Sequence, residues 1–249
     1  MNLVLHRKRL NTLLIVQQKP LHLNRYNKNN PGERETGMTK DSVRDQIIEA
    51  AKKRFSHFGY GKTTMAEIAT DCGMSPGNLY RFFPGKLDIA EAIASLDYET
   101  HLAHARKIAM APGKSAPERL RDLLFAELRR TYQKLEKDPR ALEMATQIGH
   151  ERPQFVNWML NNERKILVEL MEDAEKRGEM MPPGDREEIA EMIQSATMKF
   201  RYPQLWSKLT LPKLERELDG VLNLLYRGLC PMAAAECEAE MKARETAAA

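Results

Sequence analysis

One short stretch of the sequence carries the side chains best suited to recognising another molecule. The Asn78 amide can make two hydrogen bonds to the edge of an adenine. Tyr80, Arg81 and, further on, Lys86 can reach phosphate oxygens. Gly77 has no side chain and allows close approach of a partner. These groups suit contact with a nucleic acid, although a plain helical hairpin would also display them on its surface.

Two short helices, separated by a tight turn, are predicted to position these side chains. Thr64 begins the first helix, and Glu67 stands three residues later, as a capping box requires. Gly73 ends that helix, because glycine tolerates the left-handed backbone found at helix ends. Ser75 caps the second helix, and Pro76 takes its first position. Such a pair is typical of a helix-turn-helix, whose second helix enters the DNA major groove.

Residues 44–93 resemble the DNA-binding domain of the tetracycline-repressor (TetR) family. The resemblance rests on the following features: a long helix ending at Phe55–Gly59, a Gly-Tyr turn, Thr63–Thr64, Ile68–Ala69, Gly73-Met74-Ser75, Leu79-Tyr80 with Phe83, and Lys86. Leu87 departs from the family, which often has an acidic residue there, and Asp88 follows one position later. The departure affects only a local surface contact.

This resemblance implies an all-α protein with an N-terminal three-helix helix-turn-helix domain at residues 38–98. A helical domain for ligand binding and dimerisation is expected at residues 99–230. Operator DNA is the expected partner. The residues expected to contact it are Lys62, Thr63, Thr64, Ser75, Pro76, Gly77, Asn78, Tyr80, Arg81 and Lys86.

No other chemistry stands out in the sequence. Glycine-rich phosphate loops, GxSxG and HExxH are all absent, so we expect no catalytic residues and no enzyme activity. His101 and His104 share a helix face, yet no acidic or cysteine partner has metal-ligand spacing near them, so we expect no metal or cofactor. Three scattered cysteines, an odd number, are typical of a protein from the reducing cytoplasm.

The net charge of +4 comes from the N-terminal region. Residues 1–40 hold eight of the 39 basic residues and two of the 35 acidic ones, so the rest of the chain is nearly neutral. Residues 1–37 are polar and rich in asparagine, which predicts a disordered extension; a basic DNA-binding arm, or initiation at Met38, are the alternatives. A flexible tail is expected at residues 231–249. No apolar run approaches the roughly 20 residues that span a membrane.

Amphipathic helices fill the second domain. In TetR-like proteins this domain binds the effector, and methionines such as Met192 and Met198 suit an irregular apolar pocket. A site of this kind is concave and mostly apolar with few polar groups. The residues expected to line it are His104, Phe125, Met144, Ile148, Trp158 and Met159.

The last two helices, near residues 185–201 and 212–228, carry wide apolar stripes. TetR-like proteins pair the corresponding helices of two subunits in a four-helix bundle. We therefore expect a homodimer with contacts at Ile189, Ile193, Phe200, Leu214, Leu218, Leu222 and Leu225.

The sequence thus favours a homodimeric transcriptional regulator, a repressor released from its operator by a small apolar or amphipathic molecule. A regulator controlled by a protein partner, without a small effector, is one alternative. A helical enzyme or carrier with a vestigial DNA-binding domain is another, and it would show no sequence-specific DNA binding.

Overall fold

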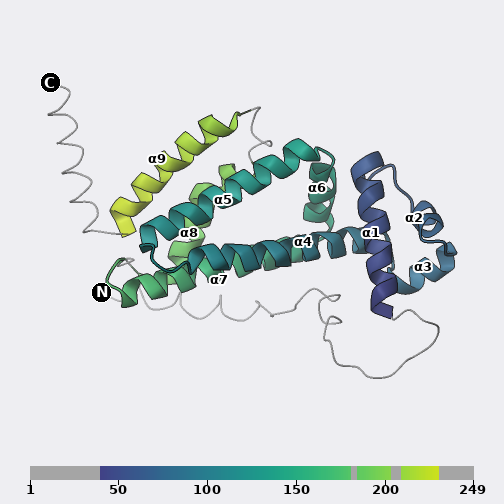
Figure 1. Ribbon diagram of the computed structural model, residues 1–249, viewed down its shortest axis with the longest axis horizontal. Coiled ribbons are helices and arrows are strands. Elements are labelled where there is room, and N and C mark those ends of the chain that lie inside the picture. The colour runs from purple at the N-terminus through teal and green to yellow at the C-terminus, as the bar shows by residue number, and fades with distance from the viewer. Residues whose placement is uncertain (1–39, 181–183, 203–208, 230–249) are drawn as a thin grey trace, which may run out of the picture. The chain divides into compact units, whose positions relative to one another are not determined.

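The regular structure of the described chain is entirely helical. The computed structural model describes residues 40–180, 184–202 and 209–229 (Figure 1). Within them the helices are α1 (Lys40–Phe58), α2 (Met65–Asp71), α3 (Pro76–Phe82), α4 (Lys86–Ala109), α5 (Ala116–Lys137), α6 (Ala141–Glu151), α7 (Pro153–Lys176), α8 (Arg186–Arg201) and α9 (Leu211–Leu229). The all-α class predicted from the sequence is confirmed. None of these helices is long and apolar enough to cross a membrane. The predicted N-terminal extension (1–37) and C-terminal tail (231–249) lie outside the described residues.

Helices α1, α2 and α3 close a small apolar core with the first half of α4 (Figure 1). Apolar residues at helical spacing place Ile47 and Phe55 on the buried face of α1. Ile68 of α2 and Leu79 of α3 are fully buried in the same core. Each such side chain contributes roughly 1.5–3 kcal/mol by leaving water. The core therefore holds the short helices α2 and α3, which would not be stable alone.

The longer helices form a second core. Helix α5 starts at a capping box, in which the backbone N–H of Ser115 donates to the Glu118 carboxylate over 2.8 Å. Its apolar face packs between α7 and α9. The buried residues of this second core include Leu120, Leu123, Leu128, Ile166, Leu170, Leu214, Leu218 and Leu222.

Helix α4 contributes to both cores. Ile89 and Ile93, near its N-terminus, pack in the first core, whereas Ala105 and Ala109 pack in the second. The helix runs without a break through residues 98 and 99, where we predicted the domain boundary. A continuous helix shared by two cores is a stiff mechanical link between them.

The structure corrects the predicted dimer contact. Leu214, Leu218 and Leu222 have 0 % of their surface exposed, because they face α5 and α8 of their own chain. Ile193 and Phe200 of α8 are buried in the same core, and Ile189 and Leu225 are partly buried against it. Five of the seven predicted contact residues are thus covered within one chain, and only Ile189 and Leu225 keep part of their surface exposed. A subunit contact on these helices must use their outward faces.

Candidate functional site

The first helix of the helix-turn-helix is held by the predicted capping box. The backbone N–H of Glu67 donates to the Thr64 hydroxyl over 3.3 Å, and the Thr64 N–H donates to the Glu67 carboxylate over 2.8 Å. The Thr64 hydroxyl also donates to this carboxylate over 2.8 Å. The bond from the Thr64 backbone N–H, followed by the bond from its hydroxyl, holds the pKa of Glu67 below its ordinary value. Helix α2 ends before Gly73, whose positive φ of 64° is the left-handed conformation that glycine favours.

Helix α3 presents its polar side chains to solvent. The Ser75 hydroxyl caps the helix by accepting from the backbone N–H of Asn78 over 3.3 Å. Leu79 points inward and is fully buried, while Tyr80 is 52 % exposed. Gly77, Pro76 and Arg81 are exposed, and Asn78 is half-buried. The predicted contact residues on α3 are therefore open to solvent, Asn78 in part and the other four to a greater extent.

Arg44 of α1 fixes the end of this helix, and sequence analysis did not identify it. Its guanidinium donates to the Phe82 carbonyl over 2.7 Å and lies 4.1 Å from the centroid of the Phe83 ring. Gln46, also on α1, donates to the Cys72 carbonyl in the turn over 3.3 Å. Both contacts join residues far apart in sequence, so only the folded chain reveals them. They hold α3 and the turn before it in place relative to α1.

Two of the predicted DNA contacts have internal roles. The Lys86 ammonium donates to the Tyr60 and Thr63 carbonyls over 2.7 and 2.8 Å and lies 4.3 Å from the Tyr60 ring centroid. Partial burial lowers the pKa of Lys86. The Thr63 side chain is buried, and its hydroxyl donates to the Gly59 carbonyl over 2.9 Å. These two residues hold the turn before α2, whereas Lys62 and Thr64 are exposed beside it.

Helix α6 and the start of α7 make polar contacts with α1, with the turn before α2 and with α4. The Glu143 carboxylate accepts from the Gly61 N–H over 2.8 Å, and Arg140 donates to the Ser56 carbonyl over 3.0 Å. Arg152 donates to Asp88 over 3.1 Å and to Glu91 over 3.2 Å. These polar contacts hold α6 and the start of α7 against the first core, where Ile148 and Phe155 are buried.

Most of the predicted ligand residues lie in packed cores. Met144, Ile148, Trp158 and Met159 pack with the core of α1–α4, where the Trp158 ring stacks on Phe155 at 5.8 Å. Phe125 is buried in the second core, with the guanidinium groups of Arg121 and Arg129 4.4 and 5.3 Å from its ring centroid. None of these five side chains lines either of the two hollows described below, so their role in ligand binding stays a prediction. His104 is the exception.

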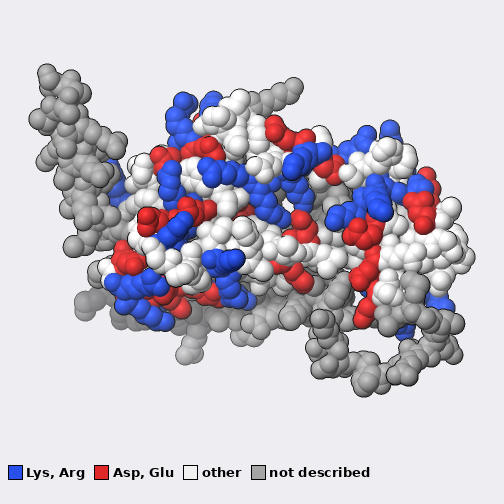
Figure 2. Space-filling view, viewed as in Figure 1, with Lys and Arg blue, Asp and Glu red and all other residues white. Residues whose placement is uncertain are grey.

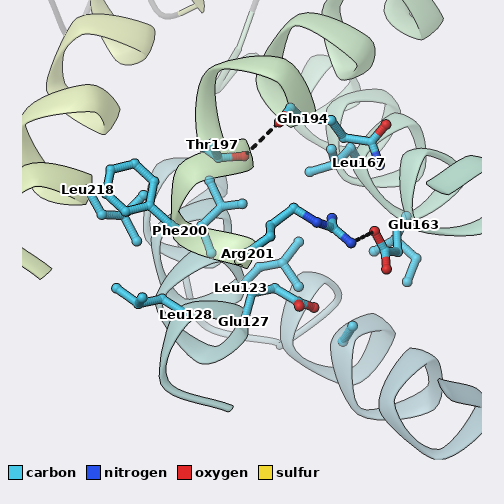
Figure 3. Close-up of a pocket in the computed structure, with 13 residues that line it drawn as sticks. Leu123, Glu127, Leu128, Glu163, Leu167, Gln194, Thr197, Phe200, Arg201 and Leu218 are labelled. Atoms are coloured by element: carbon cyan, nitrogen blue, oxygen red, sulfur yellow. Dashed lines mark hydrogen bonds and ion pairs between the residues drawn. The ribbon is translucent and has the colours of Figure 1, made fainter. Parts of the chain in front are cut away.

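A small pocket of about 30 Å³ lies among α4, α5, α7, α8 and α9 (Figure 3). It has room for about two water molecules. Figure 3 shows Arg201 of α8 pointing at Glu163 of α7, and the two form an ion pair. Glu127 also lines this pocket, and its carboxylate lies 2.5 Å from Nε2 of His101, which is not part of the lining. Burial raises the pKa of Glu163. Burial alone would also raise the pKa of Glu127, but His101, Arg201 and Arg130 together outweigh it and lower that pKa.

A larger groove of about 440 Å³ opens between α4 and α5. Its walls include His101, His104 and Asp97 from α4, and Glu127 and Lys134 from α5. Glu127 lines both this groove and the small pocket. No group of three His, Cys, Asp or Glu side chains within the described ranges is placed to hold a metal ion.

Two family descriptions match the chain. Residues 47–93 match "Bacterial regulatory proteins, tetR family", and residues 116–222 match "Tetracyclin repressor-like, C-terminal domain". The first match covers α2 and α3 with parts of α1 and α4. The second runs from the start of α5 into α9 and therefore includes the groove wall formed by α5.

Similar proteins are transcriptional regulators. The uncharacterized HTH-type transcriptional regulator YhgD of Bacillus subtilis strain 168 is 32% identical over 189 residues, which are 74% of this chain and 94% of YhgD. The HTH-type transcriptional regulator UidR of Escherichia coli strain K12 is 28% identical over 150 residues, or 56% of this chain and 70% of UidR. These alignments extend beyond the helix-turn-helix.

A solved structure has the same fold. The TetR-family repressor FadR of Thermus thermophilus, solved with lauroyl-CoA, superposes with a TM-score of 0.56 at 22% identity. The match covers 74% of this chain and 94% of FadR. At this level of identity the likeness concerns the fold.

Proposed function

Because the chain belongs to the TetR family of bacterial transcriptional regulators, we propose that it acts as a homodimeric repressor released from operator DNA by a small effector. The observation that carries the proposal is helix α3. It is capped by Ser75, anchored from behind by Arg44, and displays Asn78, Tyr80 and Arg81 outward. A rigid helix with hydrogen-bonding side chains at its free face suits direct reading of the major groove.

The outward faces of α8 and α9 are the proposed subunit contact. Met192 of α8 is 57 % exposed and Leu224 of α9 is 72 % exposed, which is unusual for large apolar side chains. Exposed charges on the two helices differ in sign: Glu188 and Glu191 stand on α8, and Lys213 and Arg216 on α9. In a twofold arrangement α8 of one subunit can face α9 of the other, so the charges are complementary.

The proposed effector binds the second domain. The lauroyl-CoA in the Thermus thermophilus FadR structure is amphipathic, which supports a small amphipathic effector here. The effector must lower the affinity for DNA by the same factor as DNA lowers the affinity for the effector, because coupling between two sites is reciprocal. The α6 and α7 contacts with Gly61, Asp88 and Glu91 give a physical route for that coupling.

Control by a protein partner is the competing function, and a fractionated cell extract distinguishes the two. The repressor–operator complex is treated with a protein-free, low-molecular-mass fraction or with the protein fraction of the same extract. We expect release by the low-mass fraction. Release by the protein fraction alone would replace the small effector with a partner protein.

Replacing Asn78 by alanine should reduce sequence discrimination. The Asn78 amide lies on the reading face of α3, and loss of a bidentate base contact costs about 1–3 kcal/mol at one base position. Alanine is a good helix former, so the helix remains. The measurement is the ratio of affinities for operator and scrambled duplexes at fixed salt.

Tyr80→Phe is the matched control for this measurement. The exposed Tyr80 hydroxyl can reach only a phosphate by our assignment, so its loss should weaken binding to both duplexes equally. An unchanged operator-to-scrambled ratio in Asn78→Ala would show that Asn78 reads no base.

A further inference from the structure

The groove between α4 and α5 is flanked by a row of basic side chains on α5. Arg130, Lys134 and Lys137 are spaced four and three residues apart, so they project from the same side of the helix along the groove. Elsewhere on the face shown in Figure 2, basic and acidic residues are interspersed. A hollow lined by three cations from one helix therefore differs from the mixed surface around it.

Acidic residues in the groove do not cancel this charge. The Asp97 carboxylate lies 2.9 Å from the Arg130 guanidinium and 2.6 Å from the Lys134 ammonium, so one carboxylate pairs with two cations. Burial alone would raise the pKa of Asp97, but these two cations outweigh it and keep the pKa low. Glu127 is already paired with His101. Three basic and two acidic residues line the groove, which leaves it positive even with both histidines neutral.

One end of the groove is apolar. Ala105 and Ile108 of α4 face Leu123 and Ala126 of α5, on the side of the groove towards the α4–α5 turn. The cations occupy the other end, towards the C-terminus of α5, and His104 adds a polar group between. The groove's volume of about 440 Å³ is within the usual range of about 300–1,000 Å³ for small-molecule sites.

We propose that this groove binds an amphipathic anion, whose carboxylate or phosphate group pairs with Lys134 and Lys137 and whose apolar part lies against Ile108 and Leu123. The inference rests on the proposed function in one respect, because it names the chemical class of the effector. Lys134 can turn from Asp97 to the incoming anion while Arg130 keeps Asp97 paired. Bound here, the anion contacts α4, the helix shared by the two cores.

Four probes with the same ten-carbon chain separate the contribution of the charged group from that of the chain. They are decanoate, decyl phosphate, decanol and decyltrimethylammonium, each titrated calorimetrically into the full-length protein at fixed salt. We expect the two anions to bind at least tenfold tighter than decanol, and the cation to bind weakest. Similar affinities for decanol and the anions, or tighter binding of the cation, would overturn the proposal.

Charge-removing variants locate the site. Lys134→Gln/Lys137→Gln should weaken anion binding at least tenfold and leave decanol unchanged, because glutamine keeps much of the side-chain stem. Lys165→Gln/Lys176→Gln removes the same charge from exposed positions on α7, outside the groove, and should change neither affinity. Equal anion affinity in the groove variant and the wild type would place the site elsewhere.

Operator release is measured separately. Lysine-dependent anion binding without release would support the groove as an anion site and contradict the effector role in the proposed function. Release by other molecules, with no anion binding in the groove, would overturn the groove assignment and leave the proposed repressor intact.

Discussion

Replacing Leu222 by glutamate should unfold the second domain. Leu222 has 0 % of its surface exposed and lies in the core formed with α5. A carboxylate there would lose its hydration without gaining a partner, and a leucine-sized volume of packing would be lost as well. The expected loss in the free energy of unfolding is about 4 kcal/mol or more, a large part of a typical domain's total stability. Thermal unfolding followed by circular dichroism measures it.

Leu224→Glu is the matched control, two residues away on the same helix. Leu224 is 72 % exposed on the outward face of α9, so the substitution should lower the thermal unfolding temperature much less than Leu222→Glu does. It should instead give a folded monomer in sedimentation, since it places a charge in the proposed contact. A Leu224→Glu protein that stayed dimeric would remove α9 from the interface, and a stable Leu222→Glu protein would contradict the buried position.

Replacing Gly77 by glutamate should abolish operator binding while the protein stays folded. A Cβ atom at Gly77 would meet no other atom within 4 Å, so the fold has room for a side chain. Glutamate is a better helix residue than glycine, and its charge suits the first turn of α3. The same charge would face the DNA phosphates, where like charges cost several kcal/mol. We expect operator affinity to fall more than about 100-fold and the unfolding temperature to stay equal or rise.

Gly149→Glu provides the comparison for Gly77→Glu. Gly149 is exposed on α6, and a Cβ atom there would also meet nothing within 4 Å. The Gly149→Glu substitution adds the same negative charge at a position away from α3, so operator affinity should change less than threefold. Equal losses in the two variants would mean that net charge, rather than the surface of α3, controls binding. Retained operator binding in Gly77→Glu would show that α3 does not enter the DNA major groove.

Local signals in the sequence predicted the helix-turn-helix in detail. Thr64 with Glu67, and Ser75 with Pro76, specify helix starts through bonds between near neighbours, and the structure contains both caps. Residue spacing also predicted the apolar stripe of α9, in which Leu214, Leu218 and Leu222 are buried. These features depend on only a few consecutive residues, so one sequence is enough to recognise them.

The partner of each buried face could not be predicted in the same way. The stripe through Leu214, Leu218 and Leu222 is apolar whether α5 or a second subunit covers it, and the structure shows α5. The Arg44 contact with Phe82 and the Lys86 contact with Tyr60 join positions 38 and 26 residues apart. Nothing in the spacing of a lone basic residue distinguishes such an internal contact from a phosphate contact.

The predicted ligand pocket shows the same limit. Met144 and Trp158 are apolar residues of the second predicted domain, yet they pack against the first core because α6 and α7 reach back to α1 and α4. The groove depends on the way α4 and α5 lie together, a property of tertiary packing. In the sequence, Lys134 and Lys137 of this groove look like the basic residues of any solvent-exposed helix face.

Selection of bound duplexes from a random-sequence library tests the central claim most directly. The full-length protein is mixed with the library at physiological salt, and the retained DNA is sequenced. A dimer that reads DNA with α3 should enrich a twofold-symmetric motif whose half-sites are about 10 base pairs, or a multiple of that, apart. Recovery of no common motif, or of a single asymmetric half-site, would contradict the account.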